Sequence, residues 1–190
     1  MTDLMRYASA LADVGPNGKL PPVERWDPPY CGELNLTISR DGVWVHEGTP
    51  IGRARLVRLF STVLRKEGDR YFLVTPVEKL GVEVEDAPFL AVLMRVEEGP
   101  RGQRLAFITN VGDEAVAGRQ HALVARRCSN GDVAPYIHIR SGLWALVARA
   151  VYYDLVALGE TRNCEGEMMF GVQSDGEFHP LGPAGAQLFG

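Results

Sequence analysis

The sequence predicts an α+β protein of two tandem, structurally related units, each an antiparallel meander with one main helix. The first observation is an internal repeat, because Arg40-Asp41-Gly42-Val43-Trp44 recurs 100 residues later as Arg140-Ser141-Gly142-Leu143-Trp144. The second is that a helical pattern of apolar residues follows each Trp, and the third is that strand-like segments surround both helices. Helices and antiparallel strands in one repeated order favour α+β over an alternating parallel-sheet fold.

Length and composition bound the domain organisation. The chain has 190 residues, of which 46% are hydrophobic and 23% charged, and its formal net charge is -4. This balance gives no general affinity for nucleic acid. We expect an N-terminal helix and Pro-rich lead-in over 1–30, a first repeat unit over 31–99 and a second over 100–190. Units of this size bury a modest share of their surface, so we expect them to pack on each other with a cleft between them.

The lead-in and the first unit are predicted from apolar spacing and turn residues. A helix is expected over 2–13, and a proline-rich stretch over 15–30 is expected to dock on the first unit. Alternation over 34–38 and 43–45 predicts a hairpin, after which a helix runs from Arg53 to Lys66 with Gly68 as its left-handed stop. The face expected to be buried holds Leu56, Leu59, Phe60, Val63 and Leu64. Strands are expected over 70–76, 82–85, 89–97 and 103–109, the last two joined by a turn at 99–102.

The second unit shows the same kinds of pattern. Strands are expected over 121–124 and 136–139, before the strand that carries Trp144. A helix from Ala150 to Leu158 ends at Gly159, and a final hairpin turns at 174–176. The helical residues expected to be buried against the sheet are Tyr152, Leu155 and Val156.

The cysteines and the apolar segments indicate in which cellular compartment the protein is expected. Cys31, Cys128 and Cys164 lie too far apart for a redox or zinc motif, and we expect free thiols without a disulfide. The first residues are charged and lack the apolar core of a signal peptide, and no later stretch approaches the ~18 apolar residues of a membrane span. A cytoplasmic location is therefore expected.

Arg53 and Arg149 are the leading candidate binding residues, because each sits at the expected first turn of its unit's main helix. A cation there faces the positive end of the helix macrodipole, which local electrostatics disfavours. An anion shared between the guanidinium and the free N–H groups of the helix start would explain the placement. The alternative is a structural ion pair with a carboxylate of the other unit.

Three further residues complete the candidate set. Lys79 can hold a phosphate as a point charge, or it can be a solvated lysine at a strand end. Arg140, like Arg40, flanks the first turn of its unit and can likewise be either an anion-binding residue or a solvated one. Tyr152 is adjacent to Tyr153, so one of the pair points away from the core and can stack on a base or sugar.

Catalytic chemistry has little support in the sequence. The four histidines lack metal-ligand spacing, and the pair Cys31 and His46 would need the fold to bring them together as nucleophile and base. We therefore assign no catalytic residue, no metal and no cofactor.

Five strings carry a resemblance to a known family. They are Trp26-Asp27-Pro28-Pro29-Tyr30-Cys31-Gly32, Gly48-Thr49-Pro50-Ile51-Gly52-Arg53, Leu56-Val57-Arg58-Leu59-Phe60, Leu73-Val74-Thr75-Pro76-Val77-Glu78-Lys79 and Asp86-Ala87-Pro88-Phe89. Through them the chain resembles, over nearly its whole length, the uncharacterised bacterial domain-of-unknown-function family 1285. The resemblance implies a duplicated α/β core, a second domain similar to pleckstrin-homology-like folds, and a nucleotide-like ligand at the domain interface with a role in signalling.

The leading hypothesis is a non-enzymatic ligand-binding regulatory or signalling protein. It would hold a nucleotide-like or phosphorylated small molecule between its two units. The residues expected to line that cleft are Arg53, Lys79, Arg140, Arg149 and Tyr152. The alternatives are an enzyme that acts on a phosphorylated metabolite and a protein–protein interaction module.

Overall fold

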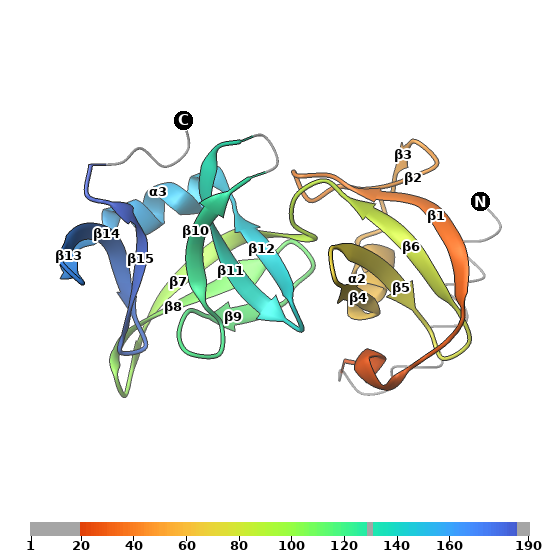
Figure 1. The fold of residues 1–190 in the computed structure, drawn as a ribbon, viewed down its shortest axis with the longest axis horizontal. Helices are drawn as coiled ribbons and strands as arrows, with labels where there is room; N and C mark the ends of the chain where they lie inside the picture. The colour runs from red at the N-terminus through yellow and green to blue at the C-terminus, as the bar shows by residue number, and fades with distance from the viewer. Residues whose placement is uncertain (1–19, 129–130, 186–190) are drawn as a thin grey trace. The chain divides into compact units, whose positions relative to one another are not determined.

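A computed structural model of the protein describes residues 20–128 and 131–185, and the chain separates into two compact units between Glu85 and Asp86 (Figure 1). The helix predicted over 2–13 lies outside the described residues. The predicted boundary near residue 100 falls inside a hairpin of the second unit, because the strand at 89–99 pairs with strands of that unit on both sides. Within the described residues, no helix is long and apolar enough to cross a membrane.

The first unit is a six-stranded sheet with one helix, preceded by the short 3-10 helix η1. The bounds are η1 Val23–Arg25, β1 Tyr30–Ile38, β2 Trp44–His46, β3 Thr49–Pro50, α2 Ala54–Thr62, β4 Leu64–Glu67, β5 Arg70–Val74 and β6 Lys79–Val84. The strand order is β3-β2-β1-β6-β5-β4. The largest fully buried side chains of this unit come from the sheet and from α2, with Trp44 and Phe60 among them.

The second unit has a six-stranded sheet, one helix and a three-stranded sheet. The bounds are β7 Phe89–Gly99, β8 Gly102–Thr109, β9 Glu114–Val116, β10 Leu123–Arg127, β11 Val133–Arg140, β12 Leu143–Val147, α3 Arg149–Ala157, β13 Glu160–Cys164, β14 Glu167–Ser174 and β15 Glu177–Pro183. The strand orders are β10-β11-β12-β7-β8-β9 and β13-β14-β15. The smaller sheet is tied to the larger one by the buried Ser174, whose hydroxyl accepts from Leu105 N (2.9 Å) and donates to Ala117 O (2.7 Å).

The two six-stranded sheets have one topology. Each consists of two three-stranded antiparallel meanders, joined by a parallel pair between the first and the last strand, β1 with β6 and β7 with β12. The prediction of two related α+β units is confirmed, whereas the prediction of wholly antiparallel sheets is wrong at these two pairs. A parallel pair needs a crossover between its strands, and in the first unit α2 lies on that connection.

The tryptophan strands are not equivalent in the two sheets. Trp44 lies on β2, which is the second strand from the edge of its sheet. Trp144 lies on β12, a central strand that pairs in parallel with β7. Trp44 is buried and Trp144 only half-buried. The repeated string predicts a strand that leads to a helix in both units, but the position of that strand in the sheet depends on pairing with distant segments.

The first main helix is shorter than predicted. α2 ends at Thr62, and residues 64–67 form β4, which pairs with β5. Gly68 has a φ of +57° in the β4–β5 turn, so it supplies a left-handed turn residue rather than a helix stop. Hydrogen bonding of β4 to β5 therefore decides the structure of residues 64–67, although their apolar spacing continues that of a helix.

The buried faces of the helices are also narrower than predicted. Phe60, Val63 and Leu64 are buried, but Leu56 and Leu59 are only half-buried. In α3 the buried residues are Val151 and Leu155, whereas Tyr152 and Val156 are half-buried. α3 contacts β7 and β14.

The three cysteines carry free thiols. Cys31 is exposed, Cys128 buried and Cys164 half-buried.

A buried arginine holds the lead-in on the first unit. Arg65 on β4 donates from Nη1 to Val23 O (2.8 Å) and to Trp26 O (2.7 Å), and its Nη2 pairs with Glu67. Its side chain is 8% exposed. The expected docking of the Pro-rich segment therefore has a definite cause, because one guanidinium satisfies two of its carbonyls.

Replacing Arg65 tests this anchor. Arg65→Ala leaves two carbonyl acceptors without a donor, and we expect the free energy of unfolding to fall by about 2 to 3 kcal/mol. Urea denaturation of the full chain measures the change. The control is Arg58→Ala on the exposed side of α2, for which we expect a change within about 0.5 kcal/mol. Equal effects of the two substitutions would contradict the anchor.

A buried histidine makes the stability of the second unit depend on pH. Burial lowers the pKa of His179 on β15, partly opposed by nearby Glu177. The folded unit therefore disfavours a proton that the unfolded chain takes up below a pH of about 6.5. This contribution is fully present above that pH and is lost as the pH falls toward the lowered folded-state pKa.

We expect the free energy of unfolding to decrease between pH 6.5 and pH 5 by at most about 1.4 kcal/mol per pH unit from this group. His179→Gln removes the titration, so its stability should vary less over that interval. The measurement is urea denaturation at several pH values, with His46→Gln of the first unit as the matched control that keeps the His179 contribution. An unchanged pH slope in His179→Gln would show that the proton is taken up elsewhere.

Candidate functional site

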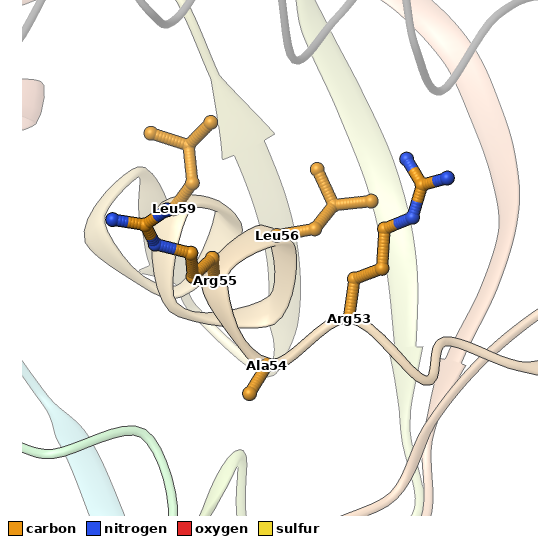
Figure 2. Close-up of a pocket in the computed structure, with 5 residues that line it drawn as sticks. All are labelled: Arg53, Ala54, Arg55, Leu56 and Leu59. Carbon is orange, nitrogen blue, oxygen red and sulfur yellow. The ribbon is translucent and has the colours of Figure 1, made fainter.

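The start of α2 places two arginines on a helix terminus without a side-chain cap. Arg53 is the N-cap residue, with extended backbone (φ -93°, ψ 96°), and its carbonyl accepts from Leu56 N (2.9 Å) and Val57 N (3.2 Å). The first turn contains no acidic residue, and Arg55 adds a second cation there. Both residues lie at the positive end of the helix dipole, which favours an anion there. Figure 2 shows the two guanidiniums pointing to opposite sides of the helix start, so they do not converge on one point.

A surface pocket of about 500 Å³ lies at this helix start, lined by Arg53, Ala54, Arg55, Leu56 and Leu59. Figure 2 shows the side chains of Leu56, Leu59 and Arg53 extending to the same side of α2, while Ala54 points the other way. The lining surface is almost entirely carbon. The pocket thus combines an apolar wall with cationic groups that are held near it by the same turn of helix.

The charges of this pocket are not neutralised within the described part of the chain. Among residues 20–128 and 131–185, no carboxylate forms an ion pair with Arg53 or Arg55, and both arginines are exposed. A guanidinium presents five N–H donors and no acceptor. The pocket can therefore accept an anion, but its side chains offer no general base.

The second predicted helix start is occupied differently. Arg149 is the first residue of α3 and donates from Nε to the Tyr153 hydroxyl (3.2 Å). Tyr152 is half-buried, and the centre of its ring lies 5.8 Å from the centre of the Tyr153 ring. Burial raises the pKa of Tyr152, with a smaller contribution from Tyr153. Tyr152 is thus a neutral phenol at physiological pH.

Lys79 is held in an ion pair in the first unit. Its Nζ lies 2.9 Å from Glu67 Oε2 and 5.0 Å from the centre of the Phe72 ring. The hydrogen bond from Lys79 lowers the pKa of Glu67, opposed by burial and reinforced by Arg65. Lys79 therefore has a structural partner where it stands.

Arg140 is likewise paired in the second unit. It forms an ion pair with Asp113, and its guanidinium lies 5.1 Å from the centre of the Phe89 ring. The candidates are divided between the units, with Arg53 and Lys79 in the first and Arg140, Arg149 and Tyr152 in the second.

Sequence reasoning missed Arg55, Leu56 and Leu59 as pocket residues. The spacing of the two leucines assigned them to the core, and the signal for Arg55 was its place two residues after Arg53. The structure describes no group of three or more potential metal-ligating side chains in residues 20–128 and 131–185.

A second polar arrangement, also missed, lies in the second unit. The Tyr136 hydroxyl contacts both carboxylate oxygens of Asp86 (2.8 and 2.9 Å), and burial raises the pKa of Tyr136, together with hydrogen bonds to Cys128 and Asp86. The guanidinium carbon of Arg126 lies 4.5 Å from the centre of the Tyr136 ring and 4.1 Å from the centre of the Trp144 ring. The contact with Tyr136 ties Asp86, the first residue of the unit, to β11.

Comparisons with known proteins identify the family. Residues 21–87 match the model of the N-terminal domain of DUF1285, a domain of unknown function, and residues 88–181 match its C-terminal domain. A comparison with curated protein sequences gives no match.

Two solved structures are similar to this chain. The crystal structure of a DUF1285 family protein from Silicibacter pomeroyi DSS-3 has a TM-score of 0.83 and 44% identity, covering 93% of this chain and 94% of that chain. A DUF1285 family protein from Shewanella baltica OS155 has a TM-score of 0.51 and 31% identity, covering 65% of this chain and 91% of that one. Because both domain models match in order and a solved member is 44% identical over most of both chains, this protein belongs to the DUF1285 family.

Proposed function

We propose that this protein is a non-catalytic, ligand-binding regulatory protein, and that the pocket at the start of α2 holds the anionic group of a nucleotide-like or phosphorylated small molecule. The observation that carries the proposal is Arg53 at a helix start without a side-chain cap, beside the pocket, with no acidic residue in the first turn. Signalling is the role that fits a protein which binds such a molecule without converting it.

The expected affinity follows from the charged hydrogen bonds. Each such bond contributes about 1.5 to 3 kcal/mol. Three or four of them, from the N–H donors of the Arg53 guanidinium and the N–H groups of the first turn, support micromolar binding, or roughly -8 kcal/mol, after the costs of association. Arg53 is the residue of the predicted set on which this proposal depends.

The other four candidates stay predictions. Lys79 and Arg140 would have to exchange a carboxylate partner for the ligand, and Arg149 a hydroxyl. Such an exchange costs more than binding at Arg53, since a partner must be released first. The cytoplasmic location and the pleckstrin-homology likeness of the second unit are likewise predictions.

A protein–protein interaction module is the second candidate function. Three apolar residues of β7 are exposed, Val92 (46%), Leu93 (49%) and Val96 (51%), and exposed apolar surface can mark an interface. An enzyme has less support, because the five residues that line the pocket include no acid or base suited to proton transfer.

A thermal-shift screen of the full chain against nucleotides and phosphorylated metabolites tests the proposal. A ligand at about 100 times its dissociation constant adds roughly 2.7 kcal/mol to the stability. Calorimetry with the best ligand should then show weaker binding by Arg53→Lys, because the planar fork is lost while the charge remains, and weaker still by Arg53→Gln.

Arg58→Gln is the matched control, since it removes an exposed cation of the same helix outside the pocket. Arg149→Lys forms a separate arm of the experiment. Affinity that depends on Arg149 and not on Arg53 would place the site at α3 and contradict the assignment to α2. No stabilising anion in the screen would argue against the function itself.

A further inference from the structure

Within the proposed class of phosphorylated molecules, the lining of the α2 pocket favours a ligand with an apolar body over one with sugar hydroxyls. Its wall consists of Ala54, Leu56, Leu59 and the aliphatic parts of two arginines. The polar side-chain groups of these five residues are guanidiniums, which donate and do not accept. A ligand hydroxyl that lost water on entering would find no acceptor among these side chains, at a cost of binding free energy.

The two leucines give the pocket its apolar character. Leu56 and Leu59 are half-buried, while the neighbouring Phe60 and Ser61 are fully buried. α2 therefore leaves part of its apolar surface accessible, and this surface lies beside the cation at its N-cap (Figure 2).

From this arrangement we infer that the ligand is a free anionic amphiphile, with one carboxylate or phosphate bound by Arg53 and an alkyl or aryl body lying against Leu56 and Leu59. The inference rests on the proposed function and names the ligand class of the same pocket. Charge complementarity selects the head group, and the carbon lining selects the body. A volume of about 500 Å³ suits one small molecule.

The charge of the protein favours a free molecule over a lipid in a bilayer. The chain carries a formal net charge of -4. Attachment to an anionic membrane depends on clusters of lysine and arginine, because each cation adds to the binding free energy. The lining of the pocket contains only two arginines. The net negative charge would oppose such attachment.

A chain-length series tests the inference on the unmodified protein. Calorimetry with hexyl, octyl and decyl phosphate and with the matching carboxylates, all below their aggregation concentrations, should give affinities that rise two- to fourfold per methylene, the upper value corresponding to full burial. Decyl alcohol should bind at least tenfold more weakly than decyl phosphate, because it lacks the charge.

Substitutions in the protein test separately the contact with the anionic head group and the contact with the apolar body. Arg53→Gln should weaken the binding of every anion of the series at least tenfold, and Arg58→Gln should weaken none of them. Leu56→Gln with Leu59→Gln should flatten the dependence on chain length. Circular dichroism checks that this last variant folds, and the series on the unmodified protein stands without it.

The outcomes distinguish this inference from the function it rests on. Pyrophosphate or ATP bound through Arg53, without any gain from a longer chain, would overturn the amphiphile and leave the anion site. Binding to phosphatidylglycerol vesicles but not to monomeric decyl phosphate would overturn a free ligand. If neither pyrophosphate, ATP nor any alkyl anion binds, both proposals fail.

Discussion

The parallel pairing of β1 with β6 is the constraint on which the first unit depends. It joins two antiparallel meanders into one sheet, with Tyr30 opposite Lys79 at one end and Ile38 opposite Val84 at the other. A crossover has to connect the meanders, and α2 is part of it. The start of α2, and with it the pocket, is therefore positioned by strand pairing between residues about 50 apart in the chain.

The same topology in the second unit is built with a different helix arrangement. There β7 pairs in parallel with β12, but α3 follows the last strand of the sheet instead of lying on the connection between the meanders. The sheet is thus the shared part of the two units. The helix, which carries the candidate chemistry in each unit, lies at a different place relative to that sheet, and Arg53 and Arg149 consequently have different surroundings.

Local features were predictable from the sequence, and features that depend on distant pairing were not. The turn glycines, the start of each helix and most strands follow from spacing that a short window contains. The β4 strand was missed because Leu64–Glu67 continues a helical pattern, and only pairing with β5 shows that Arg65 is buried. The position of Arg53 could be predicted from its helix start, whereas the exposure of Leu56 and Leu59 depends on how much of α2 the sheet covers.

The central claim is that the start of α2 binds an anionic molecule with an apolar body. An NMR titration of the isotope-labelled full chain with decyl phosphate measures this residue by residue through the backbone amide shifts. The account predicts that the largest shift changes fall within residues 53–59 and saturate with one ligand per chain. Changes concentrated in the second unit, or spread evenly over the surface without saturation, would contradict it.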